Sequence, residues 1–182
     1  MISRVVAVGG PPGSGKSTAG RGVATALGLT YRSAGEVFRA EARRFGLDLE
    51  AFGHYAEIHP EVDRTLDARM QEFATAGTLL DGRVQGELCR RRGVPVYEIQ
   101  VTAEESERVR RIAARDRQSV EEATRRMRDR EASERTRYYD LYGLRLDAVR
   151  ADVTVDSTRV PAAEVVRTIV DFLSAREAGR LP

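Results

Sequence analysis

The sequence contains one cysteine, one lysine and no asparagine among its 182 residues. A lone thiol cannot form an internal disulfide or a metal cluster, so Cys89 gives no disulfide framework and no cysteine-rich metal site. No apolar run approaches the roughly 18 residues of a membrane span, and the run VVAV near the N-terminus is too short for a signal peptide. We therefore expect a cytoplasmic protein that does not bind a membrane.

The charge of the chain is nearly balanced, since 30 basic and 28 acidic residues leave a formal net charge of +2. Such a balance lacks the basic stripe or tail that is typical of proteins that bind nucleic acid, so we expect no nucleic-acid partner. A length of 182 residues fits a single domain, residues 1–182. We expect this domain to act as a monomer.

Residues 9–18 read GGPPGSGKST, follow an apolar run, and contain the phosphate-loop pattern G-x-x-x-x-G-K-[ST]. In this pattern backbone N–H groups and the positive end of the next helix point at phosphates, and the lysine reaches the β- and γ-phosphates. Lys16 is the only lysine of the chain, which favours a chemical role, and Ser17 is placed to bind Mg²⁺. The predicted ATP-binding residues are Gly10, Pro11, Pro12, Gly13, Ser14, Gly15, Lys16, Ser17 and Thr18.

Five short apolar segments are predicted to be strands, and longer segments with helical periodicity lie between most of them. This alternation is typical of a parallel sheet covered by helices on both faces, a three-layer α/β fold of the phosphate-loop kind. A closing helix is predicted from Pro161 onward, because proline followed by apolar residues at helical spacing marks a helix start. The predicted strands are residues 3–9, 29–33, 78–82, 95–101 and 151–157.

Two helical segments fall outside this alternation, and we interpret both as insertions on one core. Residues 34–77 are predicted to hold two or three helices without a strand, interrupted at Gly46, Gly53 and Pro60. Residues 104–137 are predicted to form a charged helical pair. No internal repeat or linker marks a second autonomous domain. The predicted core consists of residues 1–33, 78–103 and 138–182.

Two classes of phosphate-loop protein are disfavoured by residues that are absent. A guanine-reading GTPase is expected to carry an N-K-x-D loop, and this chain has no asparagine and no second lysine. An ATPase that hydrolyses ATP generally has a water-activating glutamate beside the acid that ends a second strand, whereas Asp81 is followed by Gly82 and Arg83. Transfer of the phosphoryl group to a bound acceptor is therefore favoured over hydrolysis.

Three further segments follow the phosphate loop in order: SAGEVFR (33–39), LLDGR (79–83) and REASERTRYYDLYG (130–143). Together they resemble nucleoside monophosphate kinases, and most closely the short cytidylate kinases of archaeal type, over nearly the whole chain. The resemblance implies transfer from ATP to CMP or dCMP with Mg²⁺, an NMP-binding insertion at about 34–77 and a lid at about 104–137. AMP, UMP or a small metabolite as acceptor, and nucleotide binding without transfer, stay open as alternatives.

The acceptor phosphate needs fixed arginine forks, because transfer brings several negative charges together. Arg39, on the first turns of a helix, and Arg83, which follows Gly82 after a strand, are suitably placed. A solvated helix charge is the alternative for Arg39. Ser33 begins a capping box with Glu36, and the resemblance also puts its hydroxyl near the acceptor nucleotide.

Two carboxylates are predicted to take part in ligand binding. Asp81 ends its strand facing the phosphate loop, where a carboxylate can hold a water of the Mg²⁺ shell. Asp63, in the segment HPEVDRTLD, can accept a hydrogen bond from the exocyclic amine of cytosine. The alternative for Asp63 is a carboxylate on the helix surface beside Arg64.

Residues 104–137 contain eleven arginines and nine acidic residues, with a predicted break near Ser119. Arg130 and Arg137 lie two turns apart on one face and have no acid four residues before them. We expect these two, with Arg115 from the resemblance, to be catalytic lid residues that neutralise the transferring phosphoryl group and exclude water. Three ion pairs spaced i,i+4 are expected to neutralise other arginines: Glu121–Arg125, Glu122–Arg126 and Glu131–Arg135.

Overall fold

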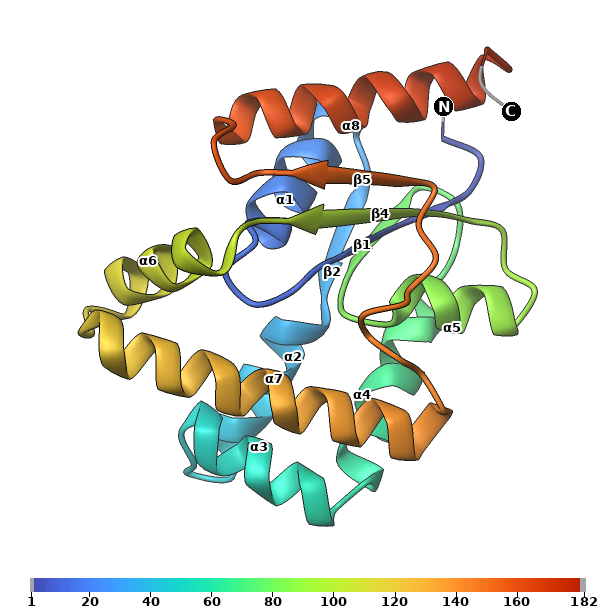
Figure 1. Cartoon of the computed structure of the whole chain (residues 1–182). Helices are drawn as coiled ribbons and strands as arrows, with labels where there is room; N and C mark the ends of the chain where they lie inside the picture. The colour runs from blue at the N-terminus through green and yellow to red at the C-terminus, as the bar shows by residue number, and fades with distance from the viewer. Residues whose placement is uncertain (1, 181–182) are drawn as a thin grey trace.

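Figure 1 shows the computed structural model of the chain, which describes residues 2–180. Five parallel strands form one sheet in the order β2-β3-β1-β4-β5, with helices on both faces. The predicted three-layer α/β fold and all five predicted strands are confirmed, and the strand ends differ from prediction by two residues at most. The strands are β1 (Val5–Gly9), β2 (Thr30–Ser33), β3 (Thr78–Asp81), β4 (Val96–Thr102) and β5 (Val153–Asp156).

The central strand β1 is buried on both faces, as is typical of a parallel sheet. Its alternate side chains enter two separate apolar clusters, since Val6 and Val8 pack in one and Val5 and Ala7 in the other. Helices α1 and α8 cover the first cluster, and α2, α4 and α5 cover the second. These helices are α1 (Lys16–Leu27), α8 (Ala162–Glu177), α2 (Ala34–Arg44), α4 (Glu61–Glu72) and α5 (Gln85–Arg91). The closing helix predicted after Pro161 is thereby confirmed.

Three helices connect β2 to β3: α2, α3 (Leu49–Ile58) and α4. Gly46 and Pro60 lie between these helices as predicted, but Gly53 lies inside α3, so the expected interruption there is wrong. A glycine within a helix costs about 1 kcal/mol relative to alanine. Burial of Phe52 and Ala56 on α3 offsets that cost.

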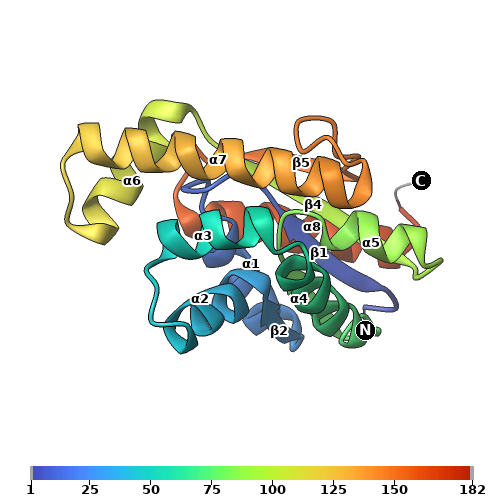
Figure 2. The same ribbon diagram turned by 90° about the horizontal axis from the view of Figure 1, so that it is seen from below.

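Two helices connect β4 to β5: α6 (Glu105–Asp116) and α7 (Val120–Tyr142). The predicted break between them is confirmed, because the Ser119 side chain caps α7 by accepting a hydrogen bond from the backbone N–H of Glu122. Figure 2 shows α3 lying along α7, with α6 beside the N-terminal end of α7. Helix α7 continues past residue 137 into the segment predicted as core. Among residues 2–180, no helix has the length and apolar character to cross a membrane.

Candidate active site

A cleft of about 910 Å³ opens at the carboxyl ends of the central strands, where ligands bind in open α/β sheets. The phosphate loop, α2, α3, α4, α6 and α7 all contribute to its walls. Of the predicted site residues, Gly10, Pro11 and Ser14 lie in the loop but do not line the cleft. The others line it: Pro12, Gly13, Gly15, Lys16, Ser17, Thr18, Ser33, Arg39, Asp63, Asp81, Gly82, Arg83, Arg115, Arg130 and Arg137.

The phosphate loop depends on three glycines whose φ angles are positive, at 140° for Gly10, 78° for Gly13 and 87° for Gly15. A side chain at Gly10 would also place its Cβ 2.1 Å from the Val101 carbonyl oxygen. Helix α1 begins at Lys16, directly after Gly15, so its first N–H groups are available to an anion in the cleft. The sequence pattern therefore folds into a phosphate-binding loop for a steric reason.

Lys16 has no acidic partner within hydrogen-bond or ion-pair distance among residues 2–180, and its Nζ donates only to the Pro11 carbonyl oxygen, at 3.5 Å. Burial of the ammonium lowers the pKa of Lys16 to about 8, and the charge of Asp81 opposes the shift. The loop thus holds a desolvated cation without a matching anion. Phosphate groups would supply that anion.

Asp81 ends β3 with 2% of its surface exposed, and two hydroxyl groups bind it. Its Oδ2 accepts hydrogen bonds from the Tyr31 hydroxyl at 2.5 Å and the Ser33 hydroxyl at 3.3 Å. The Ser33 Oγ also accepts from the Glu36 backbone N–H at 3.3 Å, which confirms the predicted cap of α2. Tyr31 was not predicted to lie here, because nothing in its local sequence indicates the contact.

Ser17 and Asp81 suit a magnesium ion by their chemistry, because both offer hard oxygen donors in the cleft that contains Lys16. Residues 2–180 contain no group of three histidine, cysteine, aspartate or glutamate side chains that could hold a metal. A magnesium ion at this place would therefore take most of its ligands from water and phosphate, which is the usual arrangement for this ion. The residues present fit that arrangement.

Glu134 of α7 lies between two of the predicted arginines and is 5% exposed. Its Oε1 accepts a hydrogen bond from Arg130 Nε at 2.7 Å, and its Oε2 lies 3.0 Å from Arg83 Nε. Sequence reasoning missed Glu134, because it considered only acids that precede Arg130 and this one follows it by a helical turn. The second of the two acidic residues in the segment REASERTRY was the available signal.

Arg39 and Arg115 carry positive charge at the same cleft. Among residues 2–180 Arg39 has no ion pair, and partial burial together with the charges of Arg130 and Arg115 lowers its pKa. Arg115 pairs with the adjacent Asp116, its Nε donating to Oδ1 at 2.7 Å. The cleft therefore brings arginines from α2, α6 and α7 near one another, as expected for a site that receives several phosphates.

Arg137 and Asp63 form an ion pair between α7 and α4, in which 8% of the arginine side chain and 2% of the aspartate side chain are exposed. The guanidinium also lies over the Phe38 ring, 5.3 Å from its centroid. Burial raises the pKa of Asp63, and Arg137 opposes that shift. The alternative of a surface carboxylate at Asp63 is wrong. Arg137 and Asp63, which were predicted separately for the lid and for the base, form one buried pair.

Only one of the three helical ion pairs expected within residues 104–137 is present, Glu122–Arg126 at 2.6 Å. The expected pair Glu121–Arg125 is wrong, because Arg125 instead contacts Glu122, Asp129 and Glu50. The expected pair Glu131–Arg135 is also wrong, because the Glu131 carboxylate pairs with Arg108 of α6. Glu131 takes a partner on another helix, and Arg125 takes one long-range partner, Glu50, beside two local ones.

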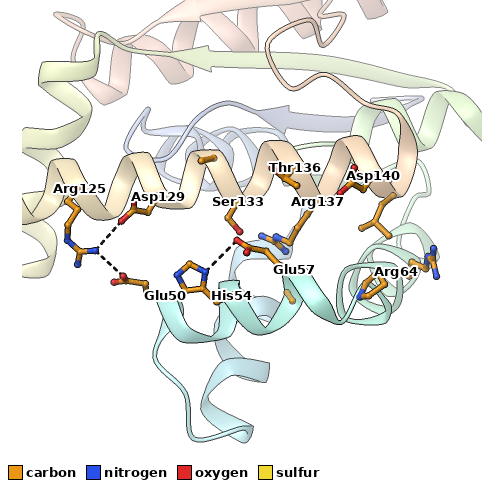
Figure 3. A pocket seen from close by; sticks show the side chains of 14 residues that line it. Glu50, His54, Glu57, Arg64, Arg125, Asp129, Ser133, Thr136, Arg137 and Asp140 are labelled. Carbon is orange, nitrogen blue, oxygen red and sulfur yellow. Dashed lines mark hydrogen bonds and ion pairs between the residues drawn. The ribbon is translucent and has the colours of Figure 1, made fainter.

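A second cavity, of about 760 Å³, lies between α3 and α7 and shares five lining residues with the cleft: Glu50, His54, Asp129, Ser133 and Arg137. Figure 3 shows Arg125 of α7 directed at both Asp129 on its own helix and Glu50 on α3. The Arg125 Nη1 donates to Glu50 Oε1 at 3.1 Å. In this structure the two inserted segments therefore touch through charged side chains.

The fold has counterparts among solved structures. A shikimate kinase from Acinetobacter baumannii in complex with shikimate superposes with a TM-score of 0.63 over 95% of this chain and 94% of that one, at 16% identity. An uncharacterized protein from Eubacterium ventriosum superposes with a TM-score of 0.66 over 94% of this chain and 99% of that one, at 13% identity. Both likenesses show the fold alone.

Sequence comparison is more specific. A family profile described as an AAA domain matches residues 9–140. The chain is 38% identical to a cytidylate kinase of Pyrobaculum neutrophilum over 93% of its length and 92% of that protein. It is 37% identical to a cytidylate kinase of Methanopyrus kandleri over 97% of both chains, and 34% identical to one of Methanococcus maripaludis over 94% and 99%. The chain belongs to the archaeal-type cytidylate kinase family, within the wider family described as an AAA domain, and is a nucleoside monophosphate kinase.

Proposed function

We propose that the enzyme transfers the γ-phosphoryl group of ATP to CMP or dCMP, with Mg²⁺ as the metal ion. The observation that carries the choice of base is the buried Asp63–Arg137 pair in the wall of the cleft. In this proposal residues 34–77 bind the acceptor and residues near 104–137 form a lid. The names of the archaeal relatives support the same acceptor.

The Asp63–Arg137 pair offers a hydrogen-bond acceptor beside a donor. Cytosine presents its N4 amine, a donor, next to the acceptor N3, so its edge is complementary to a carboxylate beside a guanidinium. Uracil presents the opposite order, with the acceptor O4 next to the donor N3–H. Adenine shares the order of cytosine, which leaves AMP as the rival acceptor on hydrogen bonding alone, and the size of the base would then decide.

The chemistry asked of the protein is alignment and charge neutralisation, because the acceptor phosphate is already a competent nucleophile. Lys16 and the N-terminus of α1 would bind the phosphates of ATP, as phosphate loops do. Arg39 and Arg83 would hold the acceptor phosphate, and Arg115 of α6 and Arg130 of α7 would neutralise the phosphoryl group in transit.

Magnesium would be held by the Ser17 hydroxyl and, through water, by Asp81. When bound, the ion supplies positive charge to the β- and γ-phosphate oxygens. The Tyr31 and Ser33 hydroxyls keep the Asp81 carboxylate directed by hydrogen bonds, which leaves its other oxygen available to a metal-bound water.

An ADP-release assay coupled to NADH oxidation tests the proposal with CMP, dCMP, UMP, AMP and GMP as acceptors. We expect kcat/KM to be highest for CMP or dCMP and at least about a hundredfold lower for UMP, since a site that pairs a polar edge rejects a base that leaves it unpaired. A preference for AMP would support the rival acceptor. Absence of ADP release with every monophosphate would favour nucleotide binding without transfer.

The Asp63→Asn variant tests how the base is recognised. Its amide can donate to O4 of uracil, so we expect kcat/KM for CMP to fall and the UMP-to-CMP ratio to rise by about tenfold or more, the value of one hydrogen-bond discrimination. An unchanged ratio in a folded variant would remove Asp63 from base recognition. Arg64→Gln on the same helix, outside the cleft lining, is the matched control and should leave the ratio unchanged.

A further inference from the structure

Glu134 is the one acidic side chain of the cleft that contacts arginines from two separate parts of the chain, within residues 2–180. Arg83 follows β3, on the loop that begins α5, whereas Arg130 lies one helical turn before Glu134 on α7. The carboxylate is buried, and 14% of the Arg83 side chain and 34% of the Arg130 side chain are exposed. Glu134 therefore links the loop after β3 to α7 in the wall of the cleft.

Both arginines meet Glu134 through the same atom, Nε, at 3.0 Å for Arg83 and 2.7 Å for Arg130. Within residues 2–180 no hydrogen bond uses the terminal nitrogens of either guanidinium. A guanidinium carries five N–H donors in a fixed plane, so fixing Nε also fixes the direction of the remaining donors. Those donors are the ones that form a two-pronged contact with phosphate oxygens.

The ion pair with Arg83 leaves room for a ligand. Although Arg83 Nε lies 3.0 Å from Glu134 Oε2, neither atom forms a hydrogen bond of good geometry, and both are buried. The ion pair therefore holds Arg83 beside Glu134 without using the terminal nitrogens of its guanidinium, which within residues 2–180 stay free for phosphate oxygens in the cleft.

A role for Glu134 in proton transfer does not fit its surroundings. Burial by itself would raise its pKa, but the charges of Arg130 and Arg83 and the hydrogen bond from Arg130 lower the pKa of Glu134 to about 2. A carboxylate that is ionised at all working pH values is a weak base. Its negative charge also opposes, in small part, the lowering of the Lys16 pKa by burial.

We propose that Glu134 is a positioning residue, which holds Arg83 and Arg130 by Nε and thereby aims their terminal nitrogens at the phosphates of the two bound nucleotides. This rests on the proposed function, in which Arg83 serves the acceptor phosphate and Arg130 the phosphoryl group in transit. Glu134 would not touch a nucleotide itself. Because Arg83 lies on the loop after β3 and Arg130 on α7, Glu134 would also fix the position of α7 relative to the acceptor site.

A mutant cycle tests this with CMP as acceptor. We expect Glu134→Gln to lower kcat/KM by about tenfold to a hundredfold, the loss that follows a small misplacement of reacting groups, with little change in the dissociation constant of ATP alone. In an Arg83→Ala, Arg130→Ala background the same substitution should cost less than about threefold, because the groups that it positions are gone. Glu131 lies on the same helix as Glu134 but outside the cleft lining, and its carboxylate pairs with Arg108 of α6. Glu131→Gln is therefore the matched control for loss of an ion pair.

Equal losses in both backgrounds would overturn the proposal, since Glu134 would then act independently of the two arginines. A lower midpoint of thermal unfolding with unchanged kcat/KM would overturn it as well, by leaving only a structural role. If Glu134→Gln does not fold, Glu134→Asp keeps the charge but shortens the side chain, and the same cycle applies. A wild-type enzyme that transfers to no monophosphate would sink the proposed function, and the positioning role with it, whereas equal losses in an active enzyme sink the positioning role alone.

Discussion

The two sides of the cleft treat positive charge differently. On the side of the phosphate loop, Lys16 has no acidic partner among residues 2–180, and its ammonium contacts only a backbone carbonyl. On the side of α4 and α7, Arg130 and Arg137 each contact a buried carboxylate, Glu134 or Asp63. The phosphate-loop side therefore has an unpaired cation that is available to a ligand. On the α4–α7 side the cations also form ion pairs that stabilise the protein.

Removal of a positively charged side chain should therefore have opposite effects on stability on the two sides. Removing an unpaired, desolvated cation takes away a ligand contact and relieves a desolvation penalty. Removing one partner of a buried ion pair leaves an uncompensated charge inside the protein. Activity and stability should thus separate on the loop side and fall together on the α4–α7 side.

The largest effect is expected on activity at Lys16. Lys16→Met should lower kcat by about a hundredfold to a thousandfold, because the transition state loses a preorganised charge. The free energy of unfolding of the ligand-free protein should not fall, since burial lowers the pKa of Lys16 to about 8 and so penalises its charged form below that pH. Urea denaturation at pH 7 beside steady-state kinetics checks both, and a marked loss of stability would break the comparison.

At Arg137 the expected effect is smaller and falls on stability, in contrast to Lys16. Arg137→Ala should lower the free energy of unfolding by about 3 kcal/mol, because Asp63 would stay buried without its partner. Arg125→Ala on the same helix is the control, with half its side chain exposed, and should cost less than about 1 kcal/mol. Equal losses of stability in the two variants would contradict the distinction between buried and exposed pairs.

The smallest effect concerns Asp67, one turn after Asp63 on α4, which within residues 2–180 accepts hydrogen bonds from neutral groups only. Its carboxylate accepts from Gln85 Nε2 at 2.7 Å and from the Tyr142 hydroxyl at 3.2 Å. Burial, with the nearby charge of Asp63, raises the pKa of Asp67 to about 7.

Because this pKa lies above that of the unfolded chain, the native state binds the extra proton between about pH 4 and pH 7. The free energy of unfolding should therefore decrease as pH rises through that window, and Asp67→Asn should lessen the decrease. Denaturation midpoints from pH 4 to pH 8 in both proteins measure it. Identical pH dependence would mean that Asp67 stays ionised when buried.

The acceptor side could be predicted only in its parts. Asp63, Arg83, Arg130 and Arg137 were all placed at the cleft from the sequence, and all line it. Two of their pairs, Asp63–Arg137 and Arg83–Glu134, were not predicted because they join residues that are distant in the sequence. The pair Arg130–Glu134 is local and was missed because only acids that precede the arginine were considered. Helical spacing accounts only for neighbours on one helix, and even there Arg125 took a long-range partner, Glu50.

The features of this protein whose physical cause is local follow from the sequence alone. Gly10, Gly13 and Gly15 permit backbone angles that other residues rarely adopt, so a contiguous motif between a strand and a helix folds into the phosphate loop. Alternating apolar strands and helices determined the sheet in the same way. The pairing of charges across α4, α7 and the loop after β3 depends on tertiary packing. A buried charge pairs with the opposite charge that packing brings close to it, however far apart the two residues are in the sequence.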